Sequence, residues 1–138
     1  MTNRFTLSVD MLGSETETND ILKGLNQSLL RNLNYKFQLY GSEKVIKKKI
    51  EKYKRLINAV EIIDCDSFIT MEDKPSDILK SKKNSSMYLA IKSVTENKSN
   101  AVLSFGNTGA LMSLSLLNIK TLKGIKRPAI ASIWPNMK

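Results

Sequence analysis

The chain has 138 residues, of which 41% are hydrophobic, so it can form one domain-sized core but not two independent domains. Lysine and arginine number 22 against 13 acidic residues, and the resulting net charge of +9 predicts that any charged partner is acidic. No histidine is present, which excludes Ser-His and Cys-His nucleophile pairs, histidine-ligated zinc and imidazole acid–base chemistry.

The cysteine content and the first residues bear on the compartment. Cys65 is the single cysteine, so no disulfide can form within the chain, as is typical of a reducing cytoplasm. The apolar stretch near the start ends at Asp10 and is too short for a signal peptide or a membrane span. Aromatic residues do not alternate with basic ones as in single-strand binding platforms, so nucleic-acid binding is not expected. We therefore expect a cytoplasmic protein.

The first half of the chain predicts strands that alternate with helices. Short β-favouring or apolar runs are predicted as strands at residues 5–10, 35–40 and 59–63. After the first strand and a polar N-cap at residues 18–20, apolar residues recur every three or four positions up to Leu33, which predicts a helix. A second helix is predicted from its N-cap at Ser42 to Ile57, with lysines crowding its outer face.

The second half continues this alternation. The predicted elements are helices at 75–82 and 85–96, a strand at 101–105, a helix at 111–117 and a fifth strand at 128–134. Strands and helices that alternate in this way predict right-handed crossovers. They also predict a parallel sheet covered by helices on both faces, which is an α/β fold.

A small polar turn at residues 104–110 joins the fourth predicted strand to the next helix. Such turns lie at the carboxyl edge of a sheet, where α/β proteins bind ligands. Gly106 and Gly109 allow close approach of the backbone, Asn107 and Thr108 offer side-chain hydrogen bonds, and free N–H groups at the helix start attract anions. We predict a site for phosphate or another oxyanion, with an ordinary helix cap as the alternative interpretation.

Two further segments are candidate parts of this anion site. Asp10 and Gly13 lie where the first predicted strand ends, so they share the edge with the turn if the two strands are parallel. Ser85 and Ser86 place two hydroxyls at a helix start, which resembles a second oxyanion cradle. A cap or loop role also explains Asp10, and plain helix capping also explains the serines.

The lysine-rich outer face of the second predicted helix, from Lys44 to Arg55, has three interpretations. It is a solvated face, a contact with a membrane surface, or a docking site for an acidic protein. The solvated face is the default because charge runs usually serve only to keep a surface in water.

Three segments occur in one order and together resemble the PlsX family. They are Lys-Asn-Ser-Ser-Met at 83–87, Ser-Phe-Gly-Asn-Thr-Gly-Ala-Leu-Met at 104–112 and Gly-Ile-Lys-Arg-Pro-Ala at 124–129. The resemblance extends over the whole chain and is strongest from Pro75 to Pro135. Members of this family are bacterial phosphate acyltransferases of phospholipid synthesis, which transfer a fatty acyl group from acyl carrier protein to inorganic phosphate.

The resemblance implies a three-layer α/β/α fold with a Rossmann-like, mostly parallel sheet, like that of isocitrate and isopropylmalate dehydrogenases. It implies acyl carrier protein and inorganic phosphate as partners, with no cofactor and no metal, and it leaves the catalytic residues unidentified. A homodimer and a peripheral contact at the inner face of the membrane are compatible with it. Because acyl carrier protein is acidic, the net charge of +9 agrees with this partner.

The chain also departs from the family pattern. The first loop of family members usually reads Asp-Ala-Met-Gly-Gly-Asp, whereas residues 10–15 here read Asp-Met-Leu-Gly-Ser-Glu. Family members are much longer, and their second half supplies further strands, most of the dimer contact and polar residues implicated in catalysis. We therefore expect residues 1–138 to be the amino-terminal part of a phosphate acyltransferase-like domain. The alternatives are a truncated, inactive homologue and a noncatalytic module that binds acyl carrier protein or a membrane surface.

Overall fold

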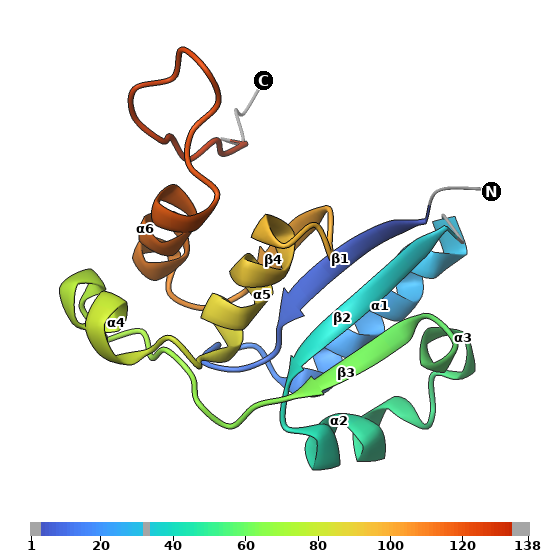
Figure 1. Cartoon of the computed structure of the whole chain (residues 1–138). Helices are drawn as coiled ribbons and strands as arrows, with labels where there is room; N and C mark the ends of the chain where they lie inside the picture. The colour runs from blue at the N-terminus through green and yellow to red at the C-terminus, as the bar shows by residue number, and fades with distance from the viewer. Residues whose placement is uncertain (1–3, 32–33, 134–138) are drawn as a thin grey trace, which may run out of the picture.

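Four strands form one parallel sheet in the order β3-β2-β1-β4 (Figure 1). The computed structural model describes residues 4–31 and 34–133. The strands are β1 (Phe5–Asp10), β2 (Tyr35–Gly41), β3 (Val60–Asp64) and β4 (Ala101–Ser104). The predicted parallel α/β sheet is confirmed, and each of these strands lies within one residue of its predicted bounds.

The pairing of the strands places apolar and polar side chains on opposite faces of the sheet. Val9 of β1 pairs with Leu39 of β2 and with Leu103 of β4, and Leu39 in turn pairs with Ile62 of β3, so one face carries a row of apolar side chains. The next position along β1 is Asp10, which points to the opposite face and pairs with Ser104. The apolar row and the polar row therefore lie on different sides of the sheet.

Helices cover both faces, so the fold has three layers (Figure 1). On the face of Val9 and Leu39 lie α1 (Thr18–Arg31), α2 (Glu43–Ile50) and α3 (Lys54–Ile57), which contribute buried side chains to one apolar cluster. On the other face lies α5 (Ser86–Thr95), which packs against β1, β2 and β4. Outside α5 lie α4 (Pro75–Ser81) and α6 (Thr108–Asn118), and these helices share a second cluster with it. No helix of the described part of the chain is long and apolar enough to cross a membrane.

The predicted fifth strand is wrong for its described residues, 128–133, which form neither strand nor helix. The whole segment from residue 119 to residue 133 leaves the end of α6 and extends away from the sheet (Figure 1). Ile130 and Ile133, the β-branched residues of 128–133, are 64% and 95% exposed. Local β-propensity is realised only where a strand finds a pairing partner and a surface to cover, and this segment has neither. Trp134 and Pro135, the last residues of the prediction, lie outside the described residues, as does Leu33.

The single long helix predicted over 42–57 is also wrong, because the structure divides it into α2 and α3. Tyr53 leaves the helical conformation with φ −108° and ψ 71°, and its hydroxyl donates to Asn19 Oδ1 of α1 at 3.3 Å. The change of direction places Leu56 in the apolar core with none of its surface exposed. Burial of Leu56 against the sheet is thus achieved by breaking the helix rather than by extending its apolar stripe.

Candidate functional site

The carboxyl ends of β1 and β4 lie side by side, since the two strands are parallel neighbours and Asp10 pairs with Ser104. The loops that follow them therefore leave the sheet at the same edge, as the sequence predicts. Their contact is close: a Cβ placed on Gly106 would lie 3.2 Å from the carbonyl oxygen of Gly13. The candidate site is this edge, together with the start of α5 that packs beneath it.

Asp10 is the centre of the site, and this residue is 1% exposed. The Ser86 hydroxyl donates to Oδ1 at 2.5 Å, and the backbone N–H of Leu12 donates to the same oxygen at 3.3 Å. The Ser104 hydroxyl donates to Oδ2 at 2.7 Å. The carboxyl group thus joins the end of β1, the start of α5 and the end of β4, rather than pointing from a loop into solvent.

Burial raises the pKa of the Asp10 carboxyl group, and the three hydrogen bonds lower it by a smaller amount. The net result is a pKa above the ordinary value, because removal from water penalises the charged form more than the hydroxyls stabilise it. A group held in this way is suited to fixing its neighbours in place. Both of its oxygens already accept hydrogen bonds from the protein, and a direct contact between Asp10 and phosphate stays a prediction.

Two glycines allow the loops to approach each other. Gly13 has φ +70°, and a Cβ on it would overlap the backbone carbonyl of Ile69. Gly106 lies between the Gly13 carbonyl oxygen and the Met87 side chain, and its N–H donates to Ser104 Oγ at 3.1 Å. The Asp10 carboxyl group therefore acts on the Gly106 loop through the Ser104 hydroxyl, which donates to Asp10 and accepts from Gly106.

Asn107 has a structural role in addition to any binding role. Its side-chain oxygen accepts from the N–H of Ala110 at 3.0 Å and so caps α6. Its amide nitrogen donates to the carbonyl oxygens of Thr70, Met71 and Asp73 at 3.1 to 3.2 Å. This residue therefore holds the loop that follows β3 against the start of α6, and its cap moves the start of the helix to Thr108, three residues before the predicted start.

Thr108 and Gly109 occupy the first turn of α6, where backbone N–H groups have no carbonyl partner within the helix. Thr108 is exposed. A Cβ on Gly109 would meet only Asn107 Oδ1, at the ordinary contact distance of 3.5 Å. The fold therefore does not require glycine at this position, in contrast to Gly13.

The two serines of the predicted second cradle are separated by the structure. Ser85 caps α5: its hydroxyl accepts from the N–H of Tyr88 at 3.3 Å and donates to the Lys82 carbonyl oxygen at 2.7 Å. Ser86 turns to Asp10 instead. Both residues are buried, so an oxyanion at this point would be held by neighbouring groups rather than by two free hydroxyls.

Ser104 was missed as a candidate site residue. It lies in the predicted turn, but its importance comes from the register that places it beside Asp10. The sequence contains a signal for this role, because Ser104 ends one predicted parallel strand and Asp10 ends another, and such residues can form a hydrogen bond if the two strands are neighbours. The sequence does not reveal that these two strands are neighbours.

Cys65 follows β3 at the same edge, where its thiol is a possible nucleophile by position alone. Burial, and then the negative charges of Asp10, Asp64 and Asp66, raise the pKa of this thiol to about 11. The reactive thiolate is therefore a minor species at neutral pH. The site as described does not support acyl transfer through a cysteine thioester.

Comparisons with known proteins indicate one family for this chain. The family described as fatty acid synthesis protein matches residues 5–138. Phosphate acyltransferase from Ruegeria sp. strain TM1040 is 38% identical over 96% of this chain, which corresponds to 36% of that protein. Phosphate acyltransferases from Parvibaculum lavamentivorans and Rhodopseudomonas palustris strain BisA53 are 35% and 37% identical over 100% of the chain, and the match covers 38% and 40% of them.

The chain thus spans well under half the length of these relatives. The match nevertheless includes β1, the start of α5 and the end of β4, which are the three segments that the buried Asp10 joins. The chain belongs to the fatty acid synthesis protein family, which is the PlsX family that its motifs resemble.

Proposed function

We propose that this chain forms one wall of a phosphate acyltransferase site, at which inorganic phosphate takes the acyl group from acyl carrier protein to give acyl phosphate. The observation that carries this proposal is the buried Asp10 carboxyl group, which joins the end of β1 to two of the motif segments, 83–87 and 104–112, at one edge of the sheet. The relatives whose matches cover this whole region are named phosphate acyltransferase, and this supports the proposal.

In the proposed reaction, a phosphate oxygen attacks the carbonyl carbon of the thioester. A C–O bond forms and the C–S bond breaks, and the electron pair of the broken bond leaves with the carrier's sulfur, which then takes a proton. Such chemistry depends on positioning two reactants and on stabilising the developing oxyanion, and it needs neither histidine nor a thiolate from the protein.

Some residues of this chain contact the phosphate in this proposal, and others hold the loops of the site in position. The backbone N–H groups of Thr108 and Gly109, in the first turn of α6, are the groups that contact the phosphate in this proposal, because free N–H groups at a helix start attract anions. Asp10 and Ser104 are positioning residues, because their hydrogen bonds fix the Gly106 loop from behind. Gly13 lets the first loop approach the second. In this proposal Ser85 and Ser86 fix the start of α5 beside the phosphate.

The proposal extends to the contacts that the family resemblance raises. Exposed apolar side chains gather on α6 and the segment after it, which favours a homodimer, and Lys120 and Lys123 lie close to them in sequence, which favours peripheral contact with an anionic membrane. Analytical ultracentrifugation and flotation with anionic vesicles measure these two contacts separately.

Calorimetric binding of inorganic phosphate to the 138-residue chain tests the site. Gly109→Val puts a branched side chain at the first turn of α6 and should weaken binding by about tenfold or more, whereas Lys49→Ala on α2 should change it by less than about twofold. Thermal unfolding of both variants separates loss of binding from loss of fold. Equal effects of the two substitutions on binding would remove the basis for the assignment.

Turnover is the second measurement. Incubated with acyl-acyl carrier protein and phosphate, the 138-residue chain alone should form little or no acyl phosphate, because catalysis by positioning requires both walls of a cleft. Rapid multiple turnover by this chain would show that the residues described here suffice, and the proposal of a single wall would then be wrong.

A further inference from the structure

The surface of α2 and α3 carries more than half of the net positive charge of the molecule. From Glu43 to Ile57, seven residues are basic and two are acidic, which is a net charge of +5 out of the +9 of the whole chain. The residues of this basic surface are Lys44, Lys47, Lys48, Lys49, Lys52, Lys54 and Arg55. In the described part of the chain, Lys47 is the one member that forms an ion pair, with Glu43.

The backbone beneath the basic surface is held firmly. Ile46, Ile50 and Leu56 are at most 5% exposed and belong to the apolar core, so the lysines project from helices whose other side is packed against the sheet layer. Because these apolar side chains are already buried, they cannot insert into a bilayer. This arrangement favours a protein partner over a membrane, since binding of an amphipathic helix to a membrane depends on an apolar face that enters the lipid.

The basic surface begins next to the candidate site. Gly41, at the end of β2, lies so close to Met11 that an added Cβ would be 2.9 Å from the Met11 Cβ. Met11 directly follows Asp10, and its N–H donates to the Tyr40 carbonyl oxygen at 3.0 Å. A macromolecule bound along α2 would therefore reach the loop of the site at the start of this helix.

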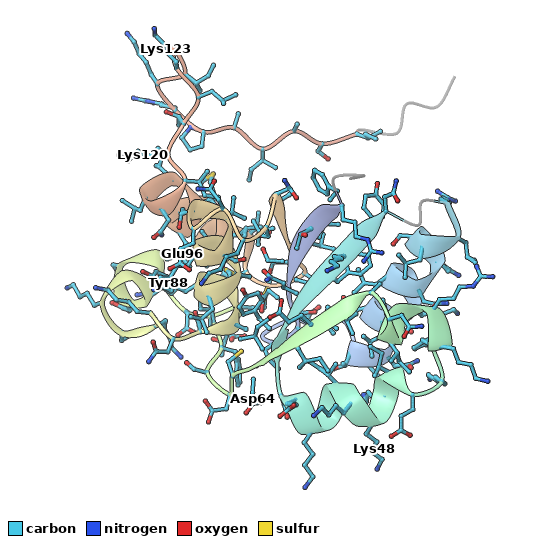
Figure 2. The ribbon with its side chains drawn as sticks, turned by 45° about the vertical axis from the view of Figure 1, so that its right-hand side comes forward. Lys48, Asp64, Tyr88, Glu96, Lys120 and Lys123 are labelled. Carbon is cyan, nitrogen blue, oxygen red and sulfur yellow. The ribbon has the colours of Figure 1, made fainter. Side chains whose placement is uncertain are left out.

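The charges on α2 surround an exposed apolar residue. Val45 is 41% exposed, and Lys48 and Lys49 follow it at the i+3 and i+4 positions of one helical stripe of α2. Figure 2 shows Lys48 on α2, at the opposite end of the molecule from Lys120 and Lys123. A partly exposed apolar side chain among cations is the composition expected of a small docking surface with an apolar centre and a charged rim.

We propose that this basic surface docks the acidic acyl carrier that presents the thioester to the site. The inference rests on the proposed function for the identity of the carrier, and on the charge, rigidity and position of α2 and α3 for the place of binding. Complementary charge of this kind accelerates association and orients the partner, and its contribution falls as salt rises.

Two triple variants with the same change in charge test the proposal. Lys44→Glu, Lys48→Glu and Lys54→Glu reverse three exposed lysines of the basic surface, and the matched control reverses the exposed Lys120, Lys123 and Lys126 after α6. Fluorescence anisotropy then measures the Kd of each protein for acyl carrier protein, at low and at physiological salt. The first variant should bind about tenfold or more weakly and lose most of its salt dependence, while the control should stay within about threefold of wild type.

Equal weakening by both triple variants would overturn the proposal, because only net charge would then matter. Unchanged carrier binding in the first variant, together with loss of its binding to anionic vesicles, would assign the surface to a membrane instead. Calorimetric phosphate binding, measured in the same proteins, distinguishes failure of the proposed function from failure of the docking surface. If wild type does not bind phosphate, the proposed function is contradicted. If wild type binds phosphate but the first variant still binds the carrier as wild type does, only the docking surface is contradicted.

Discussion

The two sides of the molecule differ in how completely their apolar residues are covered. In the layer formed by α1 to α3 on the sheet, Leu22 and Leu39 have no exposed surface. In α6 and the segment after it, Leu117 is 57% exposed and Leu122 is 82% exposed. Both regions are rich in leucine and isoleucine, so the difference lies in what packs on them and not in composition.

The boundary between the two regions runs along β4. Among the residues that the structure describes, this strand pairs with β1 alone. A groove of about 360 Å³ opens beside it, lined mainly by apolar residues of α1 and the sheet, including Leu103, and by Phe105. The relatives contain far more chain than the part matched here. The comparison shows that an apolar segment is buried only when another element of the protein packs on its apolar face.

The largest expected effect contrasts two identical substitutions. Leu22→Ala removes a fully buried side chain and should lower the free energy of unfolding by about 2–5 kcal/mol, because the transfer free energy is lost and a cavity remains. Leu122→Ala, in the open region, should change it by less than about 0.5 kcal/mol. Urea unfolding of both variants measures this. A large loss from Leu122→Ala would show that the open region is covered in solution.

A smaller effect is expected from two glycines of the site, one in each region. Gly13→Ala combines a positive φ with an overlap at the Ile69 carbonyl and should cost about 1–3 kcal/mol. Gly109→Ala, in α6, meets no such obstacle and should leave stability unchanged or raise it by up to about 1 kcal/mol. Thermal unfolding distinguishes the two. An effect of Gly13→Ala as small as that of Gly109→Ala would mean that the loop after β1 is less tightly held than the structure shows.

The smallest effect concerns Asp10, which ties the two regions together. Its pKa is raised in the folded state, so the folded protein holds this proton more tightly than the unfolded chain does. As pH rises from its ordinary value of 3.8 through the raised pKa, wild type should lose stability relative to Asp10→Asn, by at most about 1.4 kcal/mol for each pH unit.

Asp73→Asn provides a control of opposite sign. A hydrogen bond from the backbone N–H of Thr70 lowers the pKa of the Asp73 carboxyl group, so wild type should gain stability relative to Asp73→Asn over the pH range in which this group ionises. Denaturant unfolding over a series of pH values measures both differences. The same sign for both variants would contradict the burial of Asp10.

The strands that the sequence predicts correctly are those whose patterns agree with their surroundings. Residues 59–63 are a near-continuous apolar run, and the structure places β3, at residues 60–64, in a sheet with a helical layer packed against it. Residues 128–133 have a similar local pattern but lack a neighbouring strand, and this lack is not visible in their own sequence. The break at Tyr53 was missed for a related reason, since it depends on the burial of Leu56 by residues distant in the chain.

The candidate site was predictable in its location and less so in its internal roles. Glycines and small polar residues after strands indicated the edge of the sheet, and Gly13 and Gly106 do meet there. The exchange of hydrogen bonds between Asp10, Ser86 and Ser104 depends on strand order and helix packing, which local patterns do not reveal. Binding of phosphate by any of these residues stays a prediction.

The hydrogen bonds of Asp10 also bear on the order in which parts of the chain can fold during synthesis. Its partners Ser86 and Ser104 lie 76 and 94 residues further along, so they emerge from the ribosome on the order of ten seconds later. Meanwhile β1, β2 and β3 with their helices need no residue beyond Asp64 to pair. The layer of α1 to α3 can therefore assemble first, with Asp10 hydrated at its open end. The edge that holds the candidate site forms later, when β4 pairs with β1 and α6 follows it.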